Sequence, residues 1–384
     1  MNDIRRTILW VIFGFSMVLL WDKWQLHNGN KATFFPSPAA VGAAAPAAGA
    51  SAPLAGAASV PASTAPAVAS IGASAVPGTP APAAPAAREK IEVTTDVYRL
   101  TFDGEGGSLT HAELLKHADM TDKAKNFVLF DESTQRVYVA QTGLIGGSFP
   151  THKTVMTAVP GPRALKDGEN ELTIRFESPE QGGVKLVKTW TLKRGAYDIA
   201  VKHEVVNVGS TAVSPQLYLQ LVRDGNKPPG ESSFYSTFTG PAVYTDAKKY
   251  QKIEFKDIEN GKVDIPKESP NGYVAMVQHY FASAWLLADG VQRELFTRKV
   301  SDNLYSVGMI TPLGNIDPGT TKAVDARLFA GPQVETMMEK LYPGLELVKD
   351  YGWLTILSKP LYWLLDQLHK LLGNWGWSIV ALVL

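Results

Sequence analysis

A stretch of 52 residues that cannot build a core divides the chain into two unequal parts. Between Pro36 and Ala87 the sequence contains 23 alanines, ten prolines and no charged residue. Prolines spaced every few residues stop the alanines from propagating a helix, and large apolar side chains are too few to repay the entropy of ordering the segment. We therefore predict a disordered Ala/Pro-rich tether over residues 25–87, whose 52-residue Ala/Pro part would span about 40 Å as a coil and up to roughly 160 Å when extended.

The segment ahead of the tether has the pattern of a membrane anchor. Arg5 and Arg6 directly precede an uncharged run from Thr7 to Trp21. Arginines ahead of an apolar stretch hold that end in the cytoplasm, so we predict a transmembrane helix over residues 4–24 with a cytoplasmic amino terminus. A cleaved secretory signal has the same charge order. It is the less favoured alternative, because WDKWQLHN stands where signal peptidase needs small residues.

Charge and cysteine content exclude several classes of function. The 37 basic and 37 acidic residues cancel, and no cluster of lysine and arginine forms a footprint for nucleic acid. We therefore expect no nucleic acid to be bound directly. The absence of cysteine excludes disulfides, a thiolate nucleophile and a cysteine-ligated zinc site.

In residues 88–350 apolar and polar side chains alternate with a period of two, which is typical of half-buried antiparallel strands. Many such runs with glycine and proline turns predict a large β-sandwich, or two joined sheets. A hairpin is expected in WTLKRGAYDI, where glycine follows Lys-Arg, and a helix only at residues 333–341. The runs that alternate are YRLTF (98–102), ELTIRF (171–176), YDIAVKHEV (197–205), QLYLQL (216–221) and AVDARLF (323–329).

Few residues in this β-domain indicate a catalytic, cofactor or metal site. The glycine cluster at residues 103–108 is not followed by a helix, so it predicts a turn rather than a phosphate loop. His203 and His279 lie in strand-like runs, the second within a predicted buried strand over 269–287. A histidine with carboxylates could act as acid and base on a sugar, but Glu204 follows His203 directly and adjacent strand residues face opposite sides. We favour structural histidines, and expect no catalytic residue, cofactor or metal.

The end of the chain carries a leucine stripe. Six leucines recur at three- and four-residue spacing and cover about 120° of a helix. This pattern predicts an amphipathic interfacial helix within residues 351–374, lying on a membrane surface, although a helix packed on a soluble core has the same pattern. The leucines that would dip into the membrane are Leu361, Leu364, Leu365, Leu368, Leu371 and Leu372.

A second apolar run begins directly after this helix. Trp375 and Trp377 open an uncharged segment over residues 375–384, as at the start of a membrane-spanning helix. Eight residues from Trp377 would cross only about 12 Å of a hydrocarbon layer roughly 30 Å thick. We therefore expect the chain to stop inside its second transmembrane helix.

The order of these segments, together with several motifs, resembles a known family. YGW, S-x-P-L and GNWG-x-SI follow one another in the tail, and FTGPAVYTDAKKY (238–250), NGYVAMVQHYFASAW (271–285) and FAGPQ (329–333) lie in the β-domain. These motifs resemble the Gram-negative form of the membrane protein insertase family YidC. The resemblance covers nearly the whole chain except the tether.

The resemblance implies a function that periodicity alone does not reveal. Members of this family assist the insertion and folding of inner-membrane proteins, alone or with the Sec translocon. The resemblance implies that the periplasmic domain is a β-supersandwich. The partners it implies are nascent membrane proteins, Sec translocon subunits and the lipid bilayer. It also implies a hydrophilic groove that contains a functional arginine. That arginine would lie a few residues beyond Leu384, so no groove residue can be named here.

A second class of function stays open at this stage. A membrane-anchored periplasmic sugar-binding protein or sugar isomerase would also use a β-sandwich. Only analogy at the level of the fold supports it.

Overall fold

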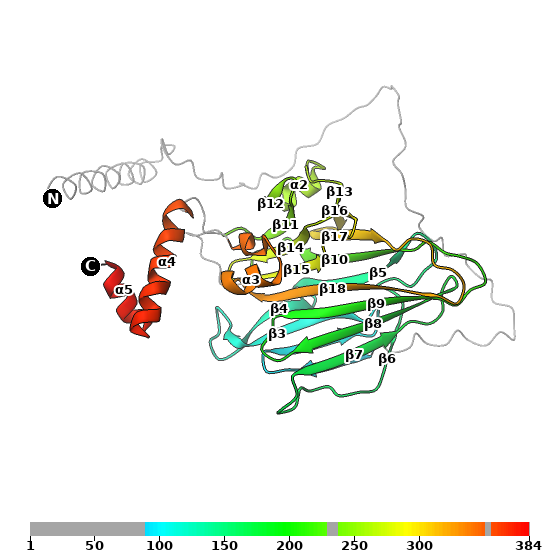
Figure 1. Cartoon of the computed structure of the whole chain (residues 1–384), viewed down its shortest axis with the longest axis horizontal. Helices are drawn as coiled ribbons and strands as arrows, with labels where there is room; N and C mark the ends of the chain where they lie inside the picture. Colours follow the sequence, from blue (N-terminus) through cyan, green and yellow to red (C-terminus); the bar gives the residue numbers. More distant parts are fainter. Residues whose placement is uncertain (1–88, 229–236, 350–354, 384) are drawn as a thin grey trace, which may run out of the picture. The chain divides into compact units, whose positions relative to one another are not determined.

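The computed structural model describes residues 89–228, 237–349 and 355–383 of the protein. Its elements are shown in Figure 1. The predicted anchor over 4–24, with Arg5 and Arg6, and the predicted tether over 25–87 lie outside the described residues.

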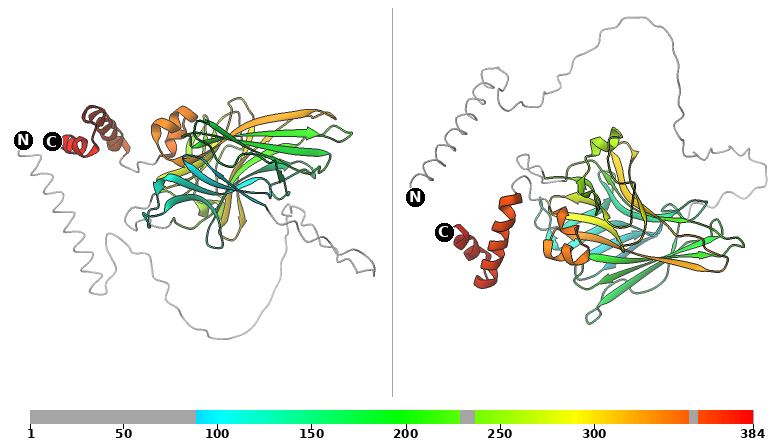
Figure 2. Two further views of the ribbon diagram at one scale, coloured as in Figure 1. Left: turned by 90° about the horizontal axis from the view of Figure 1, so that it is seen from below. Right: turned by 45° about the horizontal axis from the view of Figure 1, so that its top comes forward.

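The β-domain consists of two nine-stranded antiparallel sheets stacked face to face (Figures 1 and 2). The first sheet has the strand order β1-β2-β3-β4-β5-β10-β17-β16-β13. Its strands are β1 (Lys90–Thr94), β2 (Tyr98–Asp103), β3 (Ser108–Ala118), β4 (Asn126–Glu132), β5 (Val137–Ile145), β10 (Gln216–Asp224), β13 (Glu268–Ser269), β16 (Arg293–Ser301) and β17 (Leu304–Pro312).

The second sheet has the order β12-β11-β14-β15-β18-β9-β8-β7-β6. Its strands are β6 (Thr157–Ala158), β7 (Glu171–Glu177), β8 (Val184–Lys193), β9 (Asp198–Asn207), β11 (Gly240–Thr245), β12 (Lys249–Lys252), β14 (Tyr273–Gln278), β15 (Phe281–Leu287) and β18 (Thr321–Pro332). The mainly β architecture predicted for residues 88–350 is therefore confirmed for the part of the chain that the structure describes.

The alternating sequence runs form these strands because one face of each run is apolar. Along β7 exposed and buried residues strictly alternate, so that Leu172, Ile174 and Phe176 face the interior. The five predicted runs all lie in strands, and the predicted hairpin joins β8 to β9. Gly195 closes that hairpin with φ of +72°, a left-handed conformation that other residues adopt only with strain.

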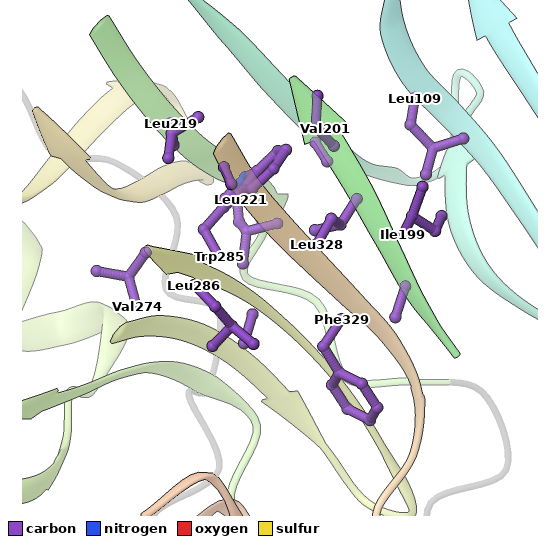
Figure 3. Packing of buried hydrophobic residues seen from close by; sticks show 14 of the residues in the cluster. Leu109, Ile199, Val201, Leu219, Leu221, Val274, Trp285, Leu286, Leu328 and Phe329 are labelled. Atoms are coloured by element: carbon purple, nitrogen blue, oxygen red, sulfur yellow. The ribbon is translucent and has the colours of Figure 1, made fainter. Parts of the chain in front are cut away.

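The core lies between the two sheets, and several side-chain hydrogen bonds cross it. Leu219 and Leu221 of β10 face Trp285 of β15 across the interior, as Figure 3 shows. The Trp285 indole Nε1 donates to the Gln220 carbonyl of the opposite sheet over 3.1 Å. The Tyr138 hydroxyl of β5 donates to the Met276 carbonyl of β14 over 3.2 Å. These bonds fix how the sheets are aligned, because their donors would be unsatisfied elsewhere in the core.

The run from 269 to 287 corrects the sequence-based prediction of one buried strand. It forms two strands, β14 and β15, joined by a turn at His279 and Tyr280. His279 therefore lies in a turn with φ of +25°, not in a strand. The turn lacks glycine, proline and asparagine, so no local signal marks it in the sequence.

Short helices complete the domain. Helix α2 (Phe255–Glu259) was not predicted, whereas α3 (Glu335–Leu341) lies within the predicted helix at 333–341. The 3₁₀ turn η1 (Leu345–Val348) follows α3. Both faces of β14 and β15 are buried, and the Tyr273 hydroxyl donates to the Gly344 carbonyl just before η1 over 2.8 Å.

Two further helices end the described chain, α4 (Thr355–Leu372) and α5 (Trp375–Val383). Helix α4 occupies most of the range predicted for the interfacial helix.

Candidate functional site

The leucine stripe predicted at the end of the chain lies on α4. Leu361, Leu364, Leu371 and Leu372 are exposed, and Leu371 is the most open at 82%. Leu365 and Leu368 are half-buried. Exposed leucines gathered on one face of a helix are typical of surfaces that contact lipid or protein.

The exposed apolar surface of α4 extends beyond the stripe. Tyr362 and Trp363 are 42% and 63% exposed, and at helical spacing they lie on the polar side or near its flank. The charged residues on this part of the helix are Asp366 and Lys370, which pair across one turn at 2.7 Å. An ion pair four residues apart stays solvated on the face opposite the leucines. The helix therefore has a leucine face, and the opposite side carries both this ion pair and the exposed Trp363.

A two-residue turn separates α4 from α5. The Gly373 N–H donates to the His369 carbonyl over 2.8 Å and ends α4 with φ of +64°. The Asn374 Oδ1 accepts from the Gly376 N–H over 2.8 Å and from the Trp377 N–H over 3.3 Å. Glycine at the end of one helix and asparagine as the cap of the next explain why the chain turns here.

Helix α5 folds back against α4 and is apolar around most of its surface. The Trp375 ring stacks on the His369 ring, with centroids 3.8 Å apart and planes 7° from parallel. Trp377, Ile379, Val380 and Val383 are all more than 45% exposed. None of the helices in the described part of the chain has both the length and the apolarity needed to cross a membrane.

Within the described part of the β-domain, each candidate histidine has a threonine hydroxyl as its side-chain partner, Thr142 for His203 and Thr237 for His279. His203 is buried in the core, where its Nε2 lies 3.0 Å from the Thr142 hydroxyl, and burial lowers its pKa to about 3. Glu204 lies on the opposite face and pairs with Lys202 at 3.0 Å. Within the described residues, no three His, Asp or Glu side chains are arranged to hold a metal ion.

Sequence reasoning missed the most unusual buried group, Lys188 of β8. Its ammonium is fully buried and donates to the Gly106 carbonyl over 2.5 Å and to the Thr142 carbonyl over 2.7 Å. His203 is its cross-strand neighbour. Burial lowers the pKa of Lys188 to about 7. The signal was present in the sequence, since Lys188 occupies an inward position between Leu186 and Trp190.

Comparison with known proteins identifies the family. Residues 90–364 match the family model described as the YidC periplasmic domain. The chain is 49% identical over 384 residues to the membrane protein insertase YidC of Janthinobacterium sp. (strain Marseille), which covers 100% of this chain and 67% of that protein. It is 52% identical over 380 residues to the membrane protein insertase YidC of Cupriavidus necator, covering 99% of this chain and 67% of that protein.

The chain belongs to the YidC family of membrane protein insertases. The resemblance inferred from the motifs is therefore confirmed. The chain spans about two thirds of the length of these curated YidC relatives. Family membership makes it an inner-membrane protein with a periplasmic domain, and the matched residues 90–364 extend from β1 into α4.

Solved structures share the fold of the YidC β-domain only weakly. A galactose mutarotase related enzyme from Lactobacillus acidophilus is 9% identical, with a TM-score of 0.40 that covers 63% of this chain and 97% of that one. A likeness at this level carries no argument about a ligand. The YidC relatives are named insertases, so the sugar-binding or sugar-isomerase alternative is not favoured.

Proposed function

We propose that this chain acts as a membrane protein insertase and chaperone, which assists insertion and folding of inner-membrane proteins alone or beside the Sec translocon. The observation that carries this proposal is the match to the YidC periplasmic domain, together with about 50% identity along the whole chain to curated insertases. Nascent membrane proteins are its clients in this proposal.

The proposed topology follows from charge and hydropathy. Residues 4–24 anchor the chain with Arg5 and Arg6 in the cytoplasm, since paired arginines ahead of an apolar run stay on that side. Residues 25–87 are the periplasmic tether, and residues 88–350 form the periplasmic domain.

Helix α4 lies at the periplasmic face of the membrane in this proposal. Its exposed leucines would dip into the acyl boundary, while the Asp366–Lys370 pair stays in water. Burying apolar area in this way is worth roughly 25 cal/mol per Å².

Helix α5 begins the next membrane-spanning segment in the same proposal. Trp375 and Trp377 would lie at headgroup depth, where tryptophan is enriched, and the residues after them carry no charge. The turn at Gly373 and Asn374 then marks the point where the chain changes from lying on the membrane to entering it.

The experiment replaces exposed leucines in cells whose only copy of the gene carries the change. With Leu364→Asp and Leu371→Asp together, we expect the inserted fraction of a test inner-membrane protein to fall several-fold at an unchanged amount of insertase. Charged side chains are costly to place at the acyl boundary, which is why insertion should suffer.

The matched control is Leu364→Met with Leu371→Met, which conserves volume and apolarity. Equal insertion by the aspartate variant and the methionine variant would show that α4 does not work through apolar contact.

A further inference from the structure

The outer face of the first sheet carries an apolar cluster that is separate from the main core. Tyr218 of β10, Phe296 of β16 and Ile310 of β17 pack together there, with Ile145 of β5 against them. Each of the three is less than 10% exposed. The solvated face of an antiparallel sheet is normally polar, so an apolar cluster at this place needs an explanation.

A cavity of about 330 Å³, here called the Tyr218 pocket, opens over this cluster. Its floor is the apolar cluster, and its other lining residues are Thr151, His152, Lys153, Gln220 and Arg298. This volume lies at the lower end of the range for ligand pockets. It is large enough for one large apolar side chain.

The backbone beneath the pocket is shaped by two glycines. A Cβ at Gly308 would lie 2.4 Å from the Phe296 ring, so only glycine lets this ring lie across β17. A Cβ at Gly143 would lie 2.4 Å from the Tyr218 hydroxyl. That hydroxyl accepts from the His152 N–H over 2.9 Å and lies 2.6 Å from its Nδ1. The pocket wall is thus held in place before any ligand arrives.

The rim of the pocket is cationic. The Arg298 guanidinium lies over the Phe296 ring, 4.5 Å from its centroid, and Lys153 lines the other side. Among the described residues, no aspartate or glutamate lines the pocket. Glu268 and Glu294 line a neighbouring depression that shares Ile310. A ligand that presents carboxylates toward Arg298 and Lys153 therefore meets complementary charge.

A polypeptide suits the pocket better than a lipid because of the glutamines beside it. The Gln220 Nε2 donates to the Gln141 Oε1 over 2.9 Å, which leaves further donor and acceptor capacity on both amides. Such amides can pair with the backbone of an extended peptide.

We infer that the Tyr218 pocket binds one large apolar side chain of an acidic polypeptide segment, whose flanking carboxylates pair with Arg298 and Lys153. The site is lined by β-domain residues alone, none of them from α4 or α5, and it goes beyond the function proposed above. It gives the periplasmic domain a recognition role of its own.

The test uses the full chain in detergent micelles and the peptide acetyl-Gly-Asp-Phe-Asp-Gly-amide as probe. Methyl resonances of Ile145 and Ile310 should shift as the peptide is added, because both side chains line the pocket. Ile174, buried in β7 of the second sheet, should not move. Shifts at Ile174 without shifts at Ile145 and Ile310, or no shifts at all, would overturn the inference.

Matched peptides and variants test the chemistry of the site. Peptides in which serine replaces the phenylalanine, or lysines replace both aspartates, should bind at least about tenfold more weakly. The double variant Lys153→Glu, Arg298→Glu should weaken binding about tenfold, since it replaces two attractive charges with two that repel the carboxylates of the peptide. Lys185→Glu, at an exposed position of β8, should leave binding unchanged. Equal binding of the lysine peptide, or no effect of the double variant, would contradict the inference.

Discussion

Lys188 is the residue whose surroundings depart furthest from those that its side chain ordinarily occupies. It lies in the core with two backbone carbonyls as acceptors. An ammonium ion buried without a carboxylate is costly, so burial lowers its pKa to about 7. Alternation along β8 predicts its inward direction, but nothing local predicts the carbonyls of Gly106 and Thr142, which distant segments supply.

The stability of the protein should therefore rise with pH above neutrality. The pKa of Lys188 is 10.5 in its ordinary state and about 7 in the folded protein, so the unfolded chain binds more protons between these values. Stability then increases by roughly 1 kcal/mol per pH unit in this window, and below about pH 7 the full cost of the buried charge is present. Urea unfolding at several pH values should show this rise in the wild type and its loss in Lys188→Met.

The control is Lys185→Met, which removes an exposed lysine from the same strand. It should keep the pH dependence of the wild type. If Lys188→Met kept that dependence too, the buried amine would not be the source.

A second prediction for a single residue concerns the buried hydroxyl of Tyr342. Its hydroxyl accepts from the buried Gly272 N–H over 2.8 Å and donates to the Asp289 carboxylate. Tyr342→Phe leaves that N–H without its acceptor, which should lower the free energy of unfolding by about 1–3 kcal/mol. Tyr305→Phe is the control. The Tyr305 hydroxyl donates to the carboxylate of the exposed Glu259, and water can replace this donor when the hydroxyl is removed. Equal losses in urea unfolding would argue against a special role for the Tyr342 contact.

At the scale of elements, the strands and the end helices differ in how far the sequence predicts them. Strands such as β7 and β9 follow from alternation, and α4 follows from leucine spacing. The β14–β15 turn does not, because its left-handed residue is His279 rather than glycine. Burial of both faces of β15 depends on tertiary packing, which no local pattern contains.

The exposed face of α4 leads to a prediction about membranes. A peptide of residues 355–373 should gain helicity on anionic vesicles, since its leucines move from water into the acyl boundary. Replacing Leu364 and Leu371 with aspartate should abolish the gain in circular dichroism, whereas replacing both with methionine should preserve it. Vesicle binding by the aspartate peptide equal to that of the parent would show that the leucine face is not what contacts lipid.

At the scale of the whole molecule, motifs predict the family and alternation predicts the mainly β domain. The comparisons confirm the family, and the structure confirms the β fold. The Tyr218 pocket could not be predicted. It depends on the register that pairs Tyr218 with Ile310 and Phe296 with Gly308 on neighbouring strands. Register of this kind is set by the packing of the whole sheet rather than by any one strand.

The most direct test of the account is the side of the membrane on which each part of the chain lies. The chain contains no cysteine, so single cysteines report position without background from within it. With a membrane-impermeant maleimide added to spheroplasts, Ser51→Cys and Lys185→Cys should be labelled at once. Asn2→Cys should be labelled only after lysis, because Arg5 and Arg6 hold it in the cytoplasm. Labelling of Asn2→Cys before lysis, or protection of Lys185→Cys, would contradict an anchored insertase with a periplasmic β-domain.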